Sequence, residues 1–316
     1  MTAHRNLQEQ QPDAPPKFTR QPFTHKTARA AGISRTELAS SAYRRLLWGI
    51  YISAAAEVDP WIDAKAALLA AQSGAFVSHH TAARLWGGVV PDVPFAHVSV
   101  PTGTARSDRQ DLVVHSSSRQ PQTFRGVSVT SPLDTFLDCA TALDLVDLVI
   151  LGDRLVKKGR ISQEALVQGC AAAAGRGCRR ARRGASLVRA GVDSVMETRA
   201  RLLRVLSGLP ELETDLRFFD DQGNLLRRLD AGDRATRTAV EYDGRHHVNR
   251  EENWEADIGR REEFEDLQWR IVTLVSKDIF VTPGATVERL RRIFRLRGLT
   301  VGPPSDEWRR YFRGHA

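Results

Sequence analysis

Two carboxylates, a glycine and two imidazoles directly follow a short apolar segment of the chain. The run is Thr238-Ala239-Val240-Glu241-Tyr242-Asp243-Gly244-Arg245-His246-His247. Its apolar residues predict a strand, in which alternate side chains share a face, so Glu241 and Asp243 point the same way with Cα atoms about 6.7 Å apart. Gly244 permits a sharp exit from the strand because glycine tolerates positive φ. The two carboxylates can then converge, and the imidazoles follow at once.

A third carboxylate, Asp230, ends the segment 225–230, which we predict to be another strand. Residues 231–234 are predicted to turn the chain back antiparallel into 236–242, which would bring Asp230 near Glu241. Two carboxylates about 4 Å apart repel by about 4 kcal/mol at an effective dielectric of about 20, so the cluster needs a proton or a cation. Oxygen-only ligands favour magnesium or manganese over zinc. The alternative is that these acids are solvated residues of loops and strand ends.

The acids belong to a longer ordered set of residues that extends to the strand predicted over 269–275. In order, the set is Asp230, Glu241-Tyr242-Asp243-Gly244 with His247, then Trp254, Asp257 and Arg261, then Leu267-Gln268-Trp269-Arg270-Ile271-Val272. This order resembles small nuclease-fold domains related to the very-short-patch-repair endonucleases, in the PD-(D/E)XK superfamily. The resemblance covers residues 194–295 and implies a restriction-endonuclease-like core, a central mixed sheet flanked by helices. It also implies hydrolysis of a phosphodiester bond.

Each acid has an expected role in such a site. We expect Asp230 and Glu241 to bind Mg²⁺ or Mn²⁺, which would polarise the scissile phosphate and lower the pKa of a bound water. Asp243 is either a third metal ligand or a residue that orients His247. His247 is the expected general base or acid, because its unperturbed pKa lies near neutrality. Asp243 also stands where the superfamily usually has a lysine, and relatives of the repair endonuclease lack that lysine too.

Two further residues are implied by the resemblance. It places an acidic helix residue, Glu197, beside the metal site, although Ser194-Val195-Met196-Glu197 also matches a capping box that would explain this glutamate structurally. It brings Arg261 toward the same site, where its charge would replace that of the missing lysine. The alternative for Arg261 is an ordinary surface pair with Asp257 at i,i+4 spacing, worth about 0.2–0.5 kcal/mol.

The composition is that of a globular protein with a basic balance. Among 316 residues, 46 Lys+Arg face 38 Asp+Glu, giving a net charge of +8, which favours a polyanionic partner such as DNA. No apolar run is long enough to cross a bilayer and no signal-peptide core is present, so we expect no membrane partner and a cytoplasmic location. The three cysteines lack CxxC spacing, so they predict no zinc site.

The segment 23–52 predicts a winged helix-turn-helix. Thr24 caps a short helix, Thr27-Ala28-Arg29-Ala30-Ala31, which stops at Gly32, and Ser34 caps a second helix that we predict to reach about Tyr43. A basic segment, 44–52, alternates like a strand or hairpin wing. In this motif the second helix enters the major groove. The expected DNA contacts are Ser34, Arg35, Thr36, Arg44 and Arg45; the alternative is a small helical cap that touches no nucleic acid.

This opening and the motif Ser78-His79-His80-Thr81-Ala82-Ala83-Arg84-Leu85-Trp86-Gly87 are similar to AbiEi-type antitoxins, which act as transcriptional regulators. The resemblance covers residues 23–169. It implies operator binding by the winged helix and a cognate toxin as partner in a type IV toxin–antitoxin system. A winged helix that reads palindromic operators often requires a homodimer. A non-catalytic regulator is therefore the alternative to the endonuclease.

The predicted organisation is a two-domain α+β and α/β protein. Residues 1–22 form a disordered leader, 23–174 a winged-helix region with a mixed α/β extension, 193–296 the nuclease-like core and 297–316 a tail. Between them, 175–192 is an Arg-rich linker. Its arginines would strengthen phosphate binding by counterion release, or they are simply solvated on a helix. They are Arg179, Arg180, Arg182 and Arg183.

The extension is predicted to alternate helices and short strands. The helices are expected over 64–73, 79–86, 131–139, 144–157 and 162–173, and the strands over 96–100, 112–115 and 127–130. Adjacent residues on a helix diverge by about 100°, so His79 and His80 are predicted to pack or cap rather than to share one metal ion.

Overall fold

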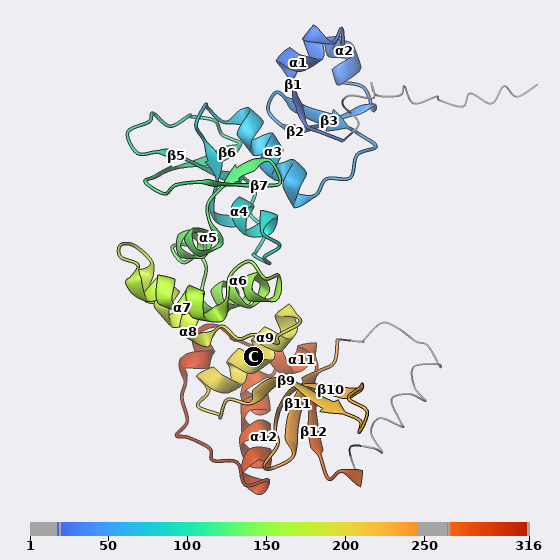
Figure 1. The fold of residues 1–316 in the computed structure, drawn as a ribbon, viewed down its shortest axis with the longest axis vertical. Coiled ribbons are helices and arrows are strands. Elements are labelled where there is room, and N and C mark those ends of the chain that lie inside the picture. The colour runs from blue at the N-terminus through green and yellow to red at the C-terminus, as the bar shows by residue number, and fades with distance from the viewer. Residues whose placement is uncertain (1–17, 19, 245–263, 265, 315–316) are drawn as a thin grey trace, which may run out of the picture. The chain divides into compact units, whose positions relative to one another are not determined.

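The computed structural model describes residues 18, 20–244, 264 and 266–314 (Figure 1). The chain divides into two compact units, Met1–Cys139 and Ala140–Ala316. Both combine helices with mixed or antiparallel sheets, as an α+β, two-domain protein should. In the part of the chain that the structure describes, no helix has both the length and the apolar character needed to cross a membrane.

The first unit begins with two short helices on a three-stranded sheet of order β1-β3-β2. The elements are β1 (Phe23–Thr24), α1 (His25–Ala30), α2 (Arg35–Leu38), β2 (Tyr43–Leu47) and β3 (Ile50–Ser53). Thr24 caps α1 as predicted, and Gly32 follows it with φ 84°. The prediction that α2 reaches Tyr43 is wrong, because the Ser40 hydroxyl donates to the Glu37 carbonyl and accepts from the Ala42 amide, which ends the helix and starts β2. Phe18, in the predicted leader, is buried against Phe23.

The rest of the first unit is a five-stranded mixed sheet of order β6-β5-β4-β8-β7 with three helices. Its elements are α3 (Pro60–Ala70), β4 (Phe76–Val77), α4 (His79–Leu85), β5 (Ala96–Pro101), β6 (Leu112–Ser117), β7 (Gln122–Phe124), β8 (Val127–Val129) and α5 (Pro132–Cys139). The predicted helices and strands are confirmed to within a few residues, while β4 and β7 were not predicted. Strands β5 and β6 run parallel, so each needs a neighbouring element to bury its apolar side chains. Ala67 of α3 packs on Val98 and Leu112 for this purpose.

The second unit opens with three packed helices, α6 (Leu145–Lys157), α7 (Gln163–Ala172) and α8 (Cys178–Leu187). Asp144 and Ser162 cap the first two. The Arg-rich segment that we predicted as a linker between domains is helix α8, and it lies inside the second unit. Its Ala181, Gly184 and Ala185 are buried, so one small-residue face packs while the arginines project from the other.

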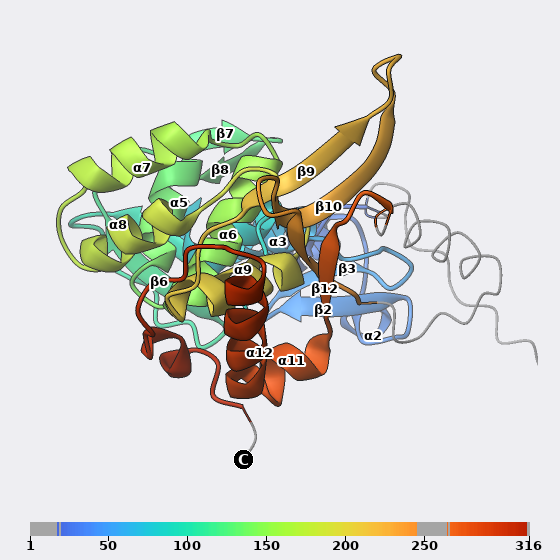
Figure 2. The ribbon, with the colours of Figure 1, turned by 90° about the horizontal axis from the view of Figure 1, so that it is seen from below.

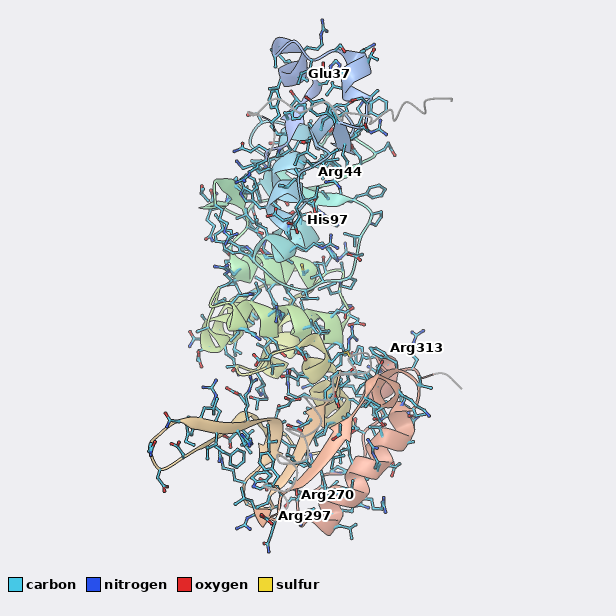
Figure 3. The ribbon with its side chains drawn as sticks, turned by 90° about the vertical axis from the view of Figure 1, so that its right-hand side faces the viewer. Glu37, Arg44, His97, Arg270, Arg297 and Arg313 are labelled. Carbon is cyan, nitrogen blue, oxygen red and sulfur yellow. The ribbon has the colours of Figure 1, made fainter. Side chains whose placement is uncertain are left out.

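A four-stranded sheet of order β12-β11-β10-β9 completes the second unit. Its strands are β9 (Glu213–Phe219), β10 (Leu225–Asp233), β11 (Thr238–Tyr242) and β12 (Arg270–Leu274), with helices α9 (Val195–Leu206), α11 (Ser276–Phe280), α12 (Pro283–Leu296) and the 3-10 helix η2 (Glu307–Arg310). Strands β9 and β10 form a hairpin that projects beyond the other strands (Figures 2 and 3). Trp308 and Phe312, in the predicted tail, are buried.

The predicted hairpin of β10 and β11 forms, but its turn is shifted. We predicted the turn at 231–234, whereas β10 continues to Asp233 and the turn occupies 234–237. The Asp233 carboxylate accepts hydrogen bonds from the amide and hydroxyl of Thr236, at 2.8 and 2.6 Å, which fixes the turn after Asp233. Strand β11 pairs antiparallel with β10 and parallel with β12.

Candidate functional site

Helix α9 positions Glu197. The Ser194 hydroxyl accepts from the Glu197 amide at 3.1 Å, and Glu197 Oε2 accepts from the Asp193 amide at 2.8 Å. The predicted capping bond of Ser194 is therefore confirmed. The other half of the capping box differs, because the Glu197 carboxylate accepts from the amide of Asp193, the residue before the cap. These two bonds hold the Glu197 side chain at the beginning of α9, close to the sheet.

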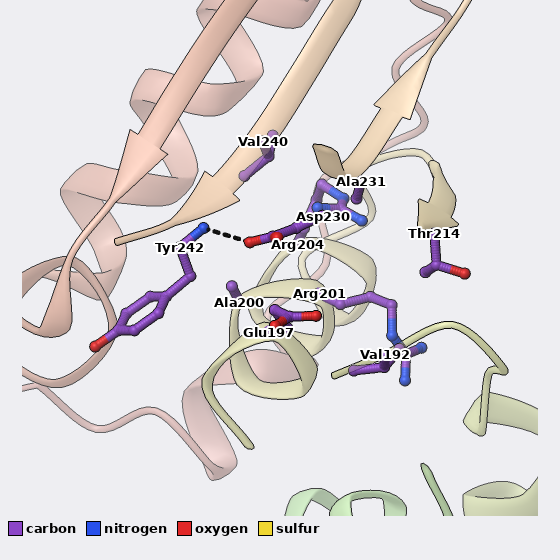
Figure 4. Close-up of a pocket in the computed structure, with 10 residues that line it drawn as sticks. All are labelled: Val192, Glu197, Ala200, Arg201, Arg204, Thr214, Asp230, Ala231, Val240 and Tyr242. Carbon is purple, nitrogen blue, oxygen red and sulfur yellow. Dashed lines mark hydrogen bonds between the residues drawn. The ribbon is translucent and has the colours of Figure 1, made fainter. Parts of the chain in front are cut away.

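The divergence of β10 from β11 positions Asp230. At the end of the hairpin away from its turn, the last backbone pair between the two strands joins Ala231 to Val240. Just beyond them the Asp230 carboxylate accepts a hydrogen bond from the Tyr242 amide at 2.9 Å, drawn in Figure 4. Asp230 thus occupies the gap where the backbone ladder stops and satisfies an amide that has lost its strand partner.

Glu197 and Asp230 line the same cavity, although they come from different elements (Figure 4). The cavity measures about 20 Å³, which suits a water molecule or an ion and is far too small for a nucleotide. Burial raises the pKa of Glu197, the Asp193 amide lowers it, and the negative charge of Asp230 raises it again. The charge of Asp230 therefore disfavours the ionisation of Glu197, as a like charge in a shared site does.

Two arginines of α9 line the cavity as well, and the sequence reasoning missed them. Arg201 and Arg204 are 2% and 1% exposed. Arg201 is paired with the buried Asp153 at 2.9 Å. The pKa of Arg204 falls to about 10, chiefly through burial and then through the charge of Arg201, and its Nη2 has no hydrogen-bond partner within the described structure. The spacing of Glu197, Arg201 and Arg204, i, i+4 and i+7, was the available signal, since it puts all three on one helix face.

The remaining predicted site residues lie beside this cavity or outside the described structure. Glu241 sits on β11 between Val240 and Tyr242, which line the cavity, but Glu241 is not among the described residues that do so. The Asp243 amide donates to the Leu274 carbonyl at 2.8 Å, which continues the β11–β12 ladder by one residue. His247 and Arg261 lie outside the described residues.

In the first unit, two of the predicted DNA contacts line a groove of about 680 Å³. Arg35 of α2 and Arg45 of β2 both border it, together with Trp48 at the end of the β2–β3 hairpin. Trp48 is 73% exposed, and the Arg45 guanidinium lies 5.5 Å from the centre of its ring. Exposed arginines interleaved with an exposed aromatic ring suit phosphates and unstacked bases.

Other predicted DNA contacts have structural partners. Ser34 and Thr36 are exposed beside Arg35, but the Ser34 hydroxyl caps α2 by accepting from the Glu37 amide. Arg44 donates to the Ala56 carbonyl at 2.7 Å. All four arginines of α8 are exposed, but Arg180 and Arg182 donate to backbone carbonyls and Arg183 pairs with Glu307.

A cluster of histidines in the first unit was also missed. His79, at the beginning of α4, lies against His97 of β5 and His115 of β6, and one ligand atom of each lies within 4.8 Å of the other two. The available signal was one histidine on each of the strands predicted over 96–100 and 112–115. The sequence does not show that these two strands pair or in which register.

Comparison with protein-family models and with curated proteins finds no match for this chain. The chemistry of the side chains described above therefore carries the functional assignment.

Proposed function

We propose that this protein binds DNA and that its second unit is a magnesium-dependent endonuclease. The observation that carries the proposal is the shared cavity of Glu197 and Asp230. The negative charge of Asp230 raises the pKa of Glu197, and two carboxylates in one cavity favour a bound cation in addition to the Arg201 and Arg204 side chains that line it.

The donor set fits the proposed ion. Carboxylate oxygens are the ligands that Mg²⁺ and Mn²⁺ prefer, and the cavity volume suits one ion with water. When bound, such an ion polarises a phosphate and lowers the pKa of a bound water. The chain itself orients the donors: the Asp193 amide holds Glu197, and the Tyr242 amide holds Asp230. We include Glu241 and Asp243 as further ligands because β11 carries them next to this cavity.

Arg204 is the chain's own source of positive charge at this site. With a pKa of about 10 it is protonated at neutral pH. Among the described residues its buried Nη2 has no hydrogen-bond partner, a costly arrangement unless a ligand satisfies it. We propose that Arg204 stabilises negative charge on the phosphate, in the role that Asp243 cannot fill and that the sequence assigned to Arg261. His247 remains the proposed general base.

The groove of the first unit supports the DNA-binding half of the proposal. Arg35 and Arg45 reach it from a helix and from the adjoining hairpin, which is the arrangement expected of a helix and wing that contact one duplex. The +8 net charge of the chain has the appropriate sign.

The proposal is tested by cleavage of supercoiled plasmid and of short single- and double-stranded oligonucleotides, with magnesium, manganese or EDTA. Wild-type protein should cut in a metal-dependent way. Asp230→Asn and Glu197→Gln should each lower the rate by about 100-fold or more, the scale on which a single electrostatic element of an active site contributes. Glu213→Gln is the matched control, because Glu213 is an exposed acid of the same sheet whose partner is Arg234.

A second candidate is a non-catalytic regulator, the antitoxin of a type IV toxin–antitoxin pair. Asp243 in place of the usual lysine favours it, and so does a binding groove in a unit separate from the acids. Tight binding to a palindromic operator by a homodimer, no cutting under any metal condition, and neutralisation of a cognate toxin would establish this function. Cutting that survives in both acid variants would instead point to a contaminating nuclease and remove support from the first candidate.

A further inference from the structure

Three neutral imidazoles meet where α4 covers the sheet of the first unit. Strands β5 and β6 are parallel, with Ser99 paired to His115, so His97 and His115 lie two residues apart on the same sheet face. His97 Nδ1 lies 3.0 Å from His115 Nε2. His97, labelled in Figure 3, is partly buried.

His79 closes the cluster from the helix. The Ser78 amide donates to the His97 carbonyl, which ties the beginning of α4 to β5. The His79 ring stacks on that of His115, with ring centres 3.7 Å apart and planes 13° from parallel. His79 adopts φ 50°, a left-handed conformation that is uncommon for residues other than glycine.

The surroundings keep the imidazoles uncharged. Burial, followed by the neighbouring His115, lowers the pKa of His79 to about 2, and the same two causes lower that of His97 to about 4. Burial also lowers the pKa of His115, followed by the charge of Arg106. A neutral imidazole has one unprotonated nitrogen, which is the state that a metal ion requires.

The outer contacts match those of histidine metal ligands. His79 Nδ1 lies 3.0 Å from Ser78 Oγ and 3.9 Å from Asp138 Oδ2, while Arg119 Nε donates to Asp138 at 2.8 Å. A carboxylate or hydroxyl on one imidazole nitrogen fixes the tautomer and leaves the other nitrogen as the ligand atom. The Ser78 hydroxyl also accepts a hydrogen bond from the Ser99 hydroxyl, and it makes no capping bond to α4.

We propose that His79, His97 and His115 bind one transition-metal ion, with zinc as the preferred ion. Tetrahedral zinc with Zn–N bonds of about 2.0–2.1 Å separates its nitrogen ligands by about 3.3 Å, and the ligand atoms here lie between 3.0 and 4.8 Å from one another. Binding would turn the His79 and His115 rings out of their stacked arrangement, so that the lone pairs of all three rings converge on the ion. Three nitrogen donors suit zinc, and the carboxylate cavity of the second unit suits magnesium, so the two sites would not compete for one ion.

The test is zinc binding by the full chain after chelator treatment, measured by calorimetry and by metal analysis after gel filtration. Wild-type protein should bind one zinc per chain at this site. His97→Asn and His115→Asn should each lower the affinity by more than about 100-fold, beyond the loss typical of an outer-shell partner. His25→Ala is the matched control, since His25, in α1, is the only histidine of the described residues that lies outside α4 and the strands β5 and β6. Asp230→Asn should also leave zinc binding unchanged.

A second measurement does not depend on the folding of variants. Cobalt-loaded wild-type protein should show the intense visible absorption of a low-coordinate nitrogen site, whereas the weak spectrum of aqueous cobalt would overturn the proposal. Zinc should also raise the melting temperature of the wild type and of His25→Ala, but not that of His115→Asn. Equal zinc affinity in the wild type and both asparagine variants, or loss of zinc only in Asp230→Asn, would assign the ion elsewhere.

Discussion

The two units use their arginines in opposite ways. In the first unit Arg35 and Arg45 are exposed along a groove, and one of them stacks near an exposed tryptophan. In the second unit Arg201, Arg204 and Arg291 are 2%, 1% and 4% exposed, and two arginines of α8 bind backbone carbonyls. The densest run of arginines in the chain is therefore largely structural. Local arginine density is a poor guide to a nucleic-acid interface, because what decides the matter is which guanidinium groups already have partners.

The two candidate ion sites also differ in how exposed their supporting arginines are. The histidine cluster is supported by Arg119, whose side chain is 27% exposed, through its pairs with Asp134 and Asp138. The carboxylate cavity is bordered by a fully buried ion pair, Arg201 with Asp153. A partly solvated support contributes little to folding, whereas removing one member of a buried pair leaves an uncompensated charge. Substitutions at the two supports should therefore separate stability from metal affinity.

The largest effect is expected for Asp153→Ala. Asp153 accepts hydrogen bonds from the Arg189 amide and the Thr198 hydroxyl in addition to its pair with Arg201. Its loss should lower the free energy of unfolding of the second unit by about 3–5 kcal/mol, because the buried Arg201 keeps only the longer, partly exposed pair with Glu211, at 3.5 Å. Urea unfolding followed by circular dichroism measures this. Asp306→Ala, which removes an exposed pair with Arg309, should cost less than about 1 kcal/mol. Equal costs would mean that Arg201 finds another partner.

A smaller effect separates the support of the histidines from the fold. Asp138→Ala should weaken zinc binding by about 10- to 100-fold, because His79 loses the carboxylate nearest its Nδ1. Asp134→Asn, which changes the other partner of Arg119, should leave the affinity within about threefold of wild type on the same grounds. Calorimetry with zinc chloride compares the two. If both variants bind zinc equally well, Asp138 orients no ligand and only holds Arg119.

The sequence predicts most elements because their ends carry local signals. Asp144, Ser162 and Ser194 each accept from an amide of the following helix, as their types and positions indicate. It fails where one side chain changes the local outcome: Ser40 ends α2 early, and Asp233 moves a turn by three residues. These two residues form short-range hydrogen bonds whose competition with helix or strand cannot be weighed from residue types alone.

At the candidate sites, local contacts could be predicted from the sequence and contacts between distant segments could not. The hairpin that brings Asp230 to β11 is a local pairing and was predicted. The cluster of His79, His97 and His115 depends on the order of strands in a sheet, which residue patterns do not determine when parallel strands are joined by long connections. The buried state of Arg204 depends on α9 packing against β11, and its composition suggested only a charged face. Contacts between distant segments were therefore the part that the sequence could not supply.

The smallest expected effect decides between the two arginine-rich regions. Each phosphate contact makes the DNA-binding constant depend on the salt concentration raised to a power of about −0.9. Arg45→Ala should therefore weaken DNA binding roughly eightfold at about 0.1 M salt and reduce the slope of log affinity against log salt by about 0.9. Arg182→Ala should leave DNA affinity unchanged and lower stability by about 1 kcal/mol, because its guanidinium binds the carbonyls of Cys170 and Ala173. Fluorescence anisotropy over a salt series, with thermal unfolding alongside, measures both. If Arg182→Ala lowers the salt slope while Arg45→Ala does not, the interface lies on α8, and the groove loses its role in DNA binding.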